Sequence, residues 1–343
     1  MKIALDAMGG DFGPQNIVGG ALLALKEYSH ITKLYLVGDT PQIEAELKKH
    51  NCNDGRIEIH HATQVVEMND NAMHAFRRKK DSSINRAVDL VKRGEAEAVV
   101  SAGHTGAAVV ATTIKLRTLP GVERPGIASM IPTETNLFIL IDAGANVDPR
   151  PIHLLQYAIM ASVYSKHVLG YTDPQIGLLS IGDEDAKGSD FTKEVFKMLR
   201  ESKLNFRGNI EGHDLFEDPA EVVVCDGFVG NVVLKTCEAI AHAIFTWLKH
   251  ELKRSPVRMA GAMMAKGAFT AIRKKIDPEE YGGSPLLGVN GICIIAHGNS
   301  TPLAIKNALR VAAESIEHQV NPHIVEEVRR HNEKTAPLEP ALQ

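Results

Sequence analysis

Short apolar runs alternate with amphipathic helical patterns along almost the whole chain, and this alternation limits the fold more than any other feature. Runs such as "KIALD", "LFILID" and "GICIIA" are apolar on both faces, which is typical of strands that helices cover on both sides of a parallel sheet. Nine strands are predicted, at residues 2–6, 33–37, 56–60, 98–102, 127–131, 137–142, 176–180, 221–226 and 291–296. The alternation therefore predicts a doubly wound, mostly parallel α/β fold.

Capping residues mark where several helices begin. Pro14 suits a first helical turn, Thr40 and Pro41 have the order N-cap then N1, and Ser83 precedes an apolar helical pattern that Gly94 ends. We expect two lobes, one of residues 1–145 with 290–335 and one of residues 146–289. The second lobe includes a helical hairpin over 230–277, and residues 336–343 are expected to form a disordered tail.

Composition excludes several classes of protein. The 343 residues are 44% hydrophobic and 23% charged, which is ordinary for a soluble globular protein. The net charge of −4 argues against bulk binding of nucleic acid. Four cysteines show no metal-binding spacing, which fits a reducing cytoplasm. The N-terminus resembles a strand and turn more than a signal peptide, and no apolar run approaches the ~20 residues of a spanning helix.

Glycine-rich loops follow six of the predicted strands, at 6–13, 101–107, 142–148, 180–189, 225–231 and 296–301. Ligands of open α/β sheets bind at the carboxyl ends of the strands, where backbone N–H groups and helix N-termini favour anions. For a single loop, an ordinary turn is the simpler interpretation. The six together favour an anion site in one crevice.

Known nucleotide and hydrolase motifs do not fit. The stretch "GDEDAKGS" at 182–189 nearly forms a P-loop, but Lys187 precedes Gly188 and three carboxylates occupy the position of a polyphosphate. The glycines of "DAMGGDFG" lack the dinucleotide-binding spacing, and Ser180 lacks the glycines of a nucleophile elbow. From the residues alone, the 182–189 loop binds a phosphate, another anion or nothing.

Several blocks resemble the phosphate acyltransferases of bacterial phospholipid synthesis, the PlsX family. The blocks run in order from residue 1 to about 320: "KIALDAMGGDFGP", "KKDSSINRAVDLVKRGEAEAVVSAGHTGA", "IDAGAN", "FRGNIEG", "CDGFVGNVVLKT" and "YGGSPLLGVNGICIIAHG". Three residues differ from the usual pattern, with His104 and Ser189 in place of Asn and Ala186 in place of Gly.

The resemblance implies a function and a set of partners. Family members convert acyl-(acyl carrier protein) and inorganic phosphate to acyl phosphate and free carrier protein, and a membrane glycerol-3-phosphate acyltransferase then uses the product. It also implies a homodimer with a fold similar to phosphotransacetylase and the isocitrate and isopropylmalate dehydrogenases. Two alternatives stay open: a dehydrogenase of similar fold, disfavoured by the missing fingerprint, and a non-catalytic lipid- or carrier-binding protein.

This reaction needs no enzyme nucleophile, because a thioester carbonyl is electrophilic and phosphate is nucleophilic at pH 7. Lys187 is the predicted phosphate ligand, with Ser189 capping the next helix. His104 and Asn231 are the predicted donors to phosphate or the oxyanion, although a helix-cap role is as reasonable for His104. Asp226 is interpreted as a partner that orients Lys187 or His104, with a protonated acid or a ligand of a divalent metal ion as the alternatives. Together with Lys187, these form the predicted catalytic set, and no metal or cofactor is expected.

Further residues are predicted to bind substrate. Asp6 ends a strand, like Asp226 and Asp142, and an Asx-type turn is as reasonable for Asp142. The predicted substrate-binding set is Asp6, Gly9, Gly10, Gly103, Thr105, Gly106, Gly188, Ser189, Asn209, Glu211 and Gly230.

A basic segment at 249–277 stands apart. Its seven cations have no acid between Glu251 and Asp277, and methionines and other apolar residues lie among them. Dimer packing, an anionic membrane surface and the acidic carrier protein are all possible uses. The predicted surface is Arg254, Arg258, Met263, Met264, Lys266 and Lys274. We therefore expect a cytoplasmic enzyme that associates peripherally with the membrane.

Overall fold

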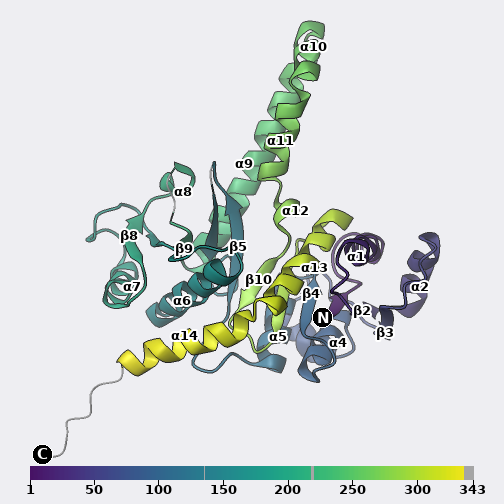
Figure 1. Ribbon diagram of the computed structural model, residues 1–343, viewed down its shortest axis with the longest axis horizontal. Coiled ribbons are helices and arrows are strands. Elements are labelled where there is room, and N and C mark those ends of the chain that lie inside the picture. Colours follow the sequence, from purple (N-terminus) through teal and green to yellow (C-terminus); the bar gives the residue numbers. More distant parts are fainter. Residues whose placement is uncertain (135, 218–219, 336–343) are drawn as a thin grey trace, which may run out of the picture.

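The computed structural model describes residues 1–134, 136–217 and 220–335. The tail predicted to be disordered, 336–343, lies outside the described residues. The described strands form a single sheet in the order β3-β2-β1-β4-β11-β10-β5-β6-β9-β7-β8, with helices on both of its faces (Figure 1). The strands are β1 (Lys2–Asp6), β2 (Lys33–Gly38), β3 (Ile57–His61), β4 (Ala98–Ser101), β5 (Gly126–Pro132), β6 (Leu137–Ile141), β7 (Ile176–Leu179), β8 (Phe206–Ile210), β9 (Val222–Val224), β10 (Ser284–Leu287) and β11 (Ile292–Ile295).

The predicted α/β class is confirmed, and all nine predicted strands are present. The helices are α1 (Gln15–Glu27), α2 (Thr40–Lys49), α3 (Ala72–Arg78), α4 (Ser83–Lys92), α5 (Thr105–Leu116), α6 (Pro151–His167), α7 (Asp190–Glu201), α8 (Asp214–Glu217), α9 (Gly227–Lys253), α10 (Pro256–Met264), α11 (Lys266–Ile276), α12 (Pro278–Tyr281), α13 (Pro302–Glu317) and α14 (Val320–Thr335). The division into two lobes stays a prediction, because one sheet runs through both.

Strands apolar on both faces pack against helices on both sides. In β1, Ile3 and Leu5 face a cluster that includes Ile17 of α1 and Ile305 of α13. Ala4, between them, faces the opposite cluster, which includes Val88 of α4. This alternation is the structural basis of the doubly wound arrangement.

The helix starts are close to those predicted, but not identical. Asp39 rather than Thr40 caps α2, because its carboxylate accepts the Gln42 N–H. Ser82 rather than Ser83 is the N-cap residue of α4, and Pro14 occupies the N-cap position of α1. Such shifts of one residue are usual where several capping residues are adjacent.

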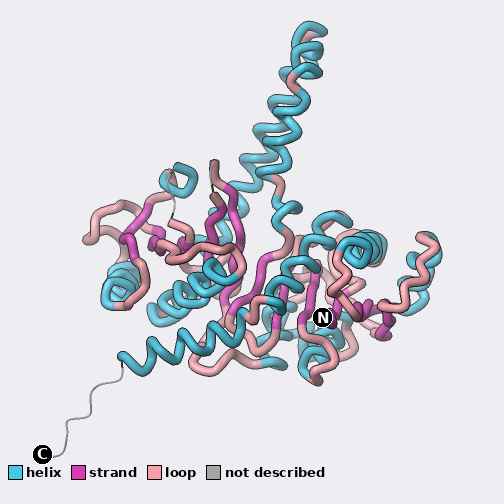
Figure 2. Tube along the Cα trace, in the orientation of Figure 1, coloured by secondary structure: helices cyan, strands magenta, loops and turns pink. Residues whose placement is uncertain are grey.

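A helical hairpin of α9, α10 and α11 projects from the body of the molecule, and Figure 2 shows that almost all of it is helical. The predicted hairpin is therefore confirmed. Within the described chain, α9 alone is long and apolar enough to cross a membrane, and only 6% of its apolar window is buried. Lys235 and Glu238 interrupt the apolar run of α9, as the absence of a long apolar run in the sequence implies, but the helix is still apolar on average.

Candidate functional site

The six glycine-rich loops fall into two groups of three, according to the direction of the strands that they follow. Strands β1, β2, β3, β4 and β11 are parallel to one another, and so are β6, β7, β8 and β9. Three antiparallel pairings in succession, β11 with β10, β10 with β5 and β5 with β6, connect the two sets. The two sets therefore run in opposite directions. They are also staggered: Ser101 at the end of β4 is level with Ser284 of β10, and Ile141 at the end of β6 pairs with Ala128, one position from that level. The carboxyl ends of both sets therefore lie at nearly the same level along the strands. We call the two groups of loops the first edge (loops 6–13, 101–107 and 296–301) and the second edge (loops 142–148, 180–189 and 225–231).

At the first edge, three loops are in direct backbone contact. A Cβ atom on Gly9 would lie 2.6 Å from the Gly103 nitrogen. A Cβ on Gly10, which has φ +88°, would lie 2.6 Å from the Gly298 oxygen. The Asp11 N–H also donates to Gly298 O at 2.7 Å. Gly9 and Gly10 are therefore required for the approach of the loops, whatever else they bind.

A buried carboxylate lies beneath these loops. Asp6 is 2% exposed, and its Oδ2 accepts from the Ser101 hydroxyl at 2.7 Å. The Gly103 N–H in turn donates to Ser101 Oγ at 3.1 Å. Burial raises the pKa of Asp6, and the hydrogen bonds from Ser83 and Ser101 oppose this effect. Asp6 and His104 line the same narrow cavity.

His104 caps α5 by accepting the Ala107 N–H at its Nδ1 atom, at 3.2 Å. The cap role considered for His104 is thus confirmed. An imidazole that accepts at Nδ1 carries its proton on Nε2, so the side chain keeps one free donor. Next to it, Thr105 is exposed and Gly106 is half-buried in the first turn of α5.

A polar cluster on the rim of the first edge was missed from the sequence. His297, in the loop after β11, lies with Nε2 3.0 Å from Glu238 Oε1 and Nδ1 3.4 Å from Lys235 Nζ. Lys235 also pairs with Glu238 at 2.8 Å. Partial burial raises the pKa of Glu238, but the hydrogen bonds and charges of His297 and Lys235 outweigh it and lower the pKa to about 2. No motif connects α9 to "AHGNST", so only the fold reveals this cluster.

At the second edge, two acids singled out from the sequence accept hydrogen bonds from backbone N–H groups. Asp142 accepts from Ile127 N at 3.0 Å, from Ala145 N at 2.9 Å and from Asn146 N at 2.7 Å. The interpretation as an Asx-type turn is confirmed. Asp226 caps α9 by accepting the Val229 N–H at 2.9 Å. Among the described residues, no cationic or donor side chain is in contact with Asp226, so its orienting role stays a prediction.

Gly230 and Asn231 follow in the first turns of α9. A Cβ on Gly230 would lie 2.0 Å from Asp142 O, so close packing requires glycine there. Asn231 is exposed beside Gly144.

The 180–189 loop presents one exposed cation. Lys187 is 51% exposed and lies 3.8 Å from Glu184, while Asp185 lies 3.3 Å from Arg200. Ser189 caps α7 by accepting the Thr192 N–H at 3.2 Å, as predicted. Gly188 has φ +101°, a conformation that favours glycine.

Asn209 supports this loop from β8. Its Nδ2 donates to Glu184 O at 2.9 Å, while its buried Oδ1 and Ser180 Oγ find no partner among the described residues. Glu211 lies 3.7 Å from His213. The loop is thus a polar site that β7 and β8 position.

Lys187 and His104 follow strands that are well separated in the sheet. Strand β7, which precedes Lys187, is six positions from β4, or about 29 Å along the sheet at ~4.8 Å per strand. The two residues also follow strands of opposite direction. A single anion site shared by both groups of loops stays a prediction.

On the hairpin, Glu251 pairs with Arg254 at 2.9 Å and with Arg258 at 2.8 Å. The expectation that these cations have no compensating acid is wrong for these two residues, because Glu251 lies one to two helical turns before them. Met263 and Met264 are 76% and 90% exposed, and Lys266 and Lys274 are exposed as well.

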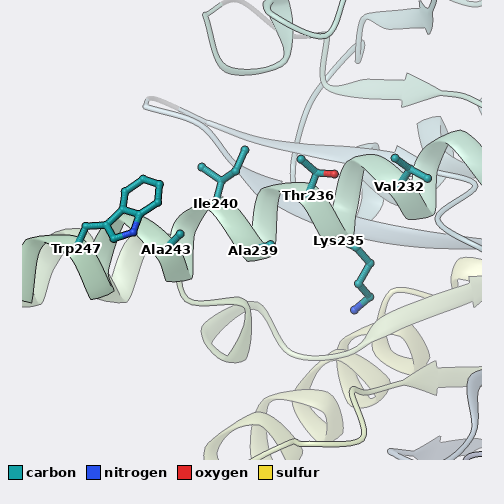
Figure 3. A pocket seen from close by; sticks show the side chains of 7 residues that line it. All are labelled: Val232, Lys235, Thr236, Ala239, Ile240, Ala243 and Trp247. Carbon is teal, nitrogen blue, oxygen red and sulfur yellow. The ribbon is translucent and has the colours of Figure 1, made fainter.

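One face of α9 is apolar and uncovered. Figure 3 shows Val232, Ile240 and Trp247 along this face, while Lys235 points to the other side of the helix. These three apolar side chains are 49%, 53% and 67% exposed. Such a contiguous exposed stripe is typical of an interaction surface.

The fold resembles that of known phosphotransacylases. It is similar to a phosphotransacetylase from Streptococcus pyogenes, with a TM-score of 0.62 and 18% sequence identity, covering 92% of this chain and 94% of that one. At this identity the likeness shows a shared fold.

Sequence comparison identifies the family. The chain belongs to the fatty acid synthesis protein family, whose model matches residues 1–323. It is 51% identical over 336 residues to a phosphate acyltransferase of Akkermansia muciniphila, covering 96% of each chain. It is also 50% identical over 320 residues to a phosphate acyltransferase of Pelotomaculum thermopropionicum, covering 93% of each. The predicted family is confirmed, and the protein is an acyltransferase whose reaction class is acyl transfer with phosphate in fatty acid or phospholipid synthesis.

Proposed function

We propose that the protein transfers an acyl group from an acyl carrier protein thioester to inorganic phosphate, releasing acyl phosphate and free carrier protein. The relatives named phosphate acyltransferase support the phosphate acceptor. We place the reaction at the first edge because of the groups that this edge combines. It combines the free Nε2 donor of His104 and the N-terminus of α5 above the buried pair of Asp6 and Ser101.

In the proposed mechanism, a phosphate oxygen attacks the thioester carbonyl carbon directly. The tetrahedral adduct then expels the thiolate, which takes up a proton, and the acyl phosphate remains. His104 Nε2–H and the first amides of α5 are suitable donors to the oxyanion. Burial raises the pKa of the Cys225 thiol well above its usual range and that of Cys293 to about 12, so neither thiol serves as a thiolate nucleophile. Direct attack fits this arrangement better than an acyl-cysteine intermediate.

For Lys187 we propose an anion contact at the second edge. The exposed ammonium group, the glycine turn at Gly188 and the unpartnered Ser180 Oγ support it. Asn231 faces solvent at the same edge, in the neighbouring loop. Whether this site holds the reacting phosphate is decided by the kinetics of Lys187 variants described in the Discussion.

The deciding experiment is a turnover assay with purified acyl-(acyl carrier protein), with phosphate present or omitted. We expect acyl phosphate to form, and free carrier thiol to appear in equal amount, only when phosphate is present. Release of thiol at the same rate without phosphate indicates a thioesterase. No release in either case, with carrier bound, supports the non-catalytic alternative.

We also propose that the enzyme is a cytoplasmic homodimer whose hairpin contacts the anionic membrane surface. The uncovered apolar face of α9 supports dimerisation, and the exposed Met263 and Met264 beside basic residues support membrane contact. A membrane glycerol-3-phosphate acyltransferase is the proposed consumer of the acyl phosphate. Sedimentation of the Ile240→Glu variant tests the dimer. We expect this variant to be a monomer. If it still dimerises at the concentrations at which the wild type does, the apolar face of α9 is not the dimer interface.

A further inference from the structure

The segment 65–80, which we call the wall, begins at the His104 cavity. Val65 and Val66 line that cavity together with Asp6 and His104. Farther along, Ala72 of α3 packs against α5, where a Cβ on Gly106 would lie 3.2 Å from the Ala72 Cβ. Helix α3 is therefore fixed beside the N-terminus of α5, at the mouth of the first edge.

This wall carries four consecutive basic residues, 77–80, of which one is used internally. Lys79 Nζ donates to Asp70 Oδ2 at 2.6 Å and to Val65 O at 2.8 Å, which holds the wall together. The bond with Lys79 lowers the pKa of Asp70. Arg77, Arg78 and Lys80 are exposed, and no ion pair joins them to another described residue.

The acids around these cations are already engaged, with one exception. Asp70 pairs with Lys79, and Asp81 pairs with Arg86 at 2.6 Å. Glu67 is the remaining exposed acid of the segment. Met73, one helical turn before Arg77, is 40% exposed. The result is a cationic surface with an apolar contact, which we call the docking face (Met73, Arg77, Arg78 and Lys80).

We infer that the docking face binds the acidic carrier protein that presents the acyl thioester, an inference that rests on the proposed function. Unpaired cations attract an acidic partner and accelerate its association. The partner must also be held near the mouth so that its thioester reaches His104. The dipole of α3 favours basic residues in its last turn, where Arg77 and Arg78 lie. It does not account for Lys80, which lies beyond that turn.

The hairpin is less suited to this role. Lys235 marks the level of the first edge on α9, and Lys253 lies 18 residues farther, or about 27 Å at 1.5 Å per residue. A carrier bound at the top of the hairpin is therefore far from His104. The two basic surfaces accordingly have different partners, the membrane for the hairpin and the carrier for the docking face.

The test is the double variant Arg77→Glu with Arg78→Glu, in the full-length protein. The matched control is Lys193→Glu with Lys203→Glu. This variant makes the same charge change at two exposed lysines that form no ion pair with another described residue. Three quantities are measured: turnover of acyl carrier protein against its concentration, turnover of the acyl thioester of N-acetylcysteamine, and binding of fluorescently labelled carrier by anisotropy at several salt concentrations.

We expect the KM for the carrier substrate and the Kd for labelled carrier to rise about tenfold at low salt, with a weaker salt dependence. The double variant should turn over the small thioester as fast as the wild type does. The control variant should match the wild type in all three measurements. Unchanged carrier affinity overturns the inference, and so does an equal loss with the small thioester, because that indicates a distorted site. A rise in KM for Lys266→Glu with Lys274→Glu instead assigns docking to the hairpin. If the wild type binds carrier but does not turn it over, the proposed function fails while the anisotropy still decides the face.

Discussion

His104 accepts a backbone N–H through Nδ1 and keeps a donor on Nε2, so capping and substrate binding are compatible in this one side chain. Asp142 and Asp226 are different, because backbone N–H groups donate to both oxygens of Asp142 and to Oδ1 of Asp226. A carboxylate that ends a strand before glycine is thus explained by the turn it stabilises. At the scale of single residues, the hydrogen-bond partners separate positions that look alike in the sequence.

Replacement of Lys187 by Ala tests the anion contact proposed at the second edge. The ammonium group is about half exposed and screened by solvent, so we expect a loss near the lower end for a charged contact, about 1.5 kcal/mol or roughly tenfold in the KM for phosphate. Steady-state kinetics at varied phosphate measure this. Lys193→Ala, nearby on α7, is the control. An unchanged KM for phosphate shows that the Lys187 loop does not bind the reacting phosphate.

Alkylation tests the absence of a cysteine nucleophile. Burial raises the pKa of the Cys225 and Cys293 thiols, so both stay protonated and inert near pH 7. We expect iodoacetamide to leave these two residues unmodified in the native protein, and Cys225→Ala to retain turnover. Mass spectrometry after a timed reaction provides the first measurement. Loss of turnover in proportion to modification of either thiol contradicts direct attack by phosphate.

At the scale of elements, α9 connects the loops of the second edge with those of the first edge. Its first turn belongs to the second edge, where Asp226 caps it, and Lys235 and Glu238 contact His297 at the first edge. Beyond that point the helix leaves the body and enters the hairpin (Figure 1). The His297 cluster therefore fixes where the projecting part of α9 begins.

Glu238→Gln should weaken this attachment in a pH-dependent manner. The pKa of Glu238 is lowered from about 4.5 to about 2 in the fold, so its ionised form contributes stability that is complete above pH 4.5. This contribution is lost as the pH falls from 4.5 through 2. We expect the variant to be about 1–3 kcal/mol less stable at pH 7, and the difference to shrink between pH 4.5 and pH 3. Urea unfolding at these pH values measures it, and a constant difference contradicts the assigned ion pair.

The elements missed from the sequence share a physical cause. Strand β10 has the sequence "SPLL", and a proline within a short run argues against a central strand. It is tolerated here at the antiparallel junction of the sheet. Strand β8 contains Gly208 at φ +127° and lies at the end of the sheet, so its pattern is not that of a buried strand. Both depend on neighbours that are distant in the sequence.

At the scale of the whole molecule, the hairpin is placed to reach a surface that the body does not touch. Met263→Asp with Met264→Asp should release the protein from anionic vesicles, because both side chains are more than three-quarters exposed beside basic residues. Vesicle flotation with anionic and neutral lipids measures the binding. Met259→Asp is the comparison variant, because Met259 lies in the same helix but is only 51% exposed. It shows whether the loss of binding depends on the position of the methionine.

The same variant separates the three uses of the hairpin. We expect the dimer and the turnover of soluble acyl carrier protein to be retained. Dissociation of the dimer in sedimentation places the methionines in the subunit interface. Loss of carrier turnover with an intact dimer assigns the hairpin to the carrier and contradicts the docking face proposed on α3.

The sequence by itself determined the α/β class, nine of the strands, the hairpin and the family, because each of these depends on local periodicity or on residues adjacent in the chain. It also located the loops, since glycine marks the turns and close contacts that Gly9, Gly10 and Gly230 make. Only the tertiary structure decided which loops meet. Strand direction reverses across β10 and β5, so Lys187 and His104 follow strands of opposite direction, while Lys235 and His297, 62 residues apart, come into contact. Such contacts depend on the order and direction of strands, which no local pattern encodes.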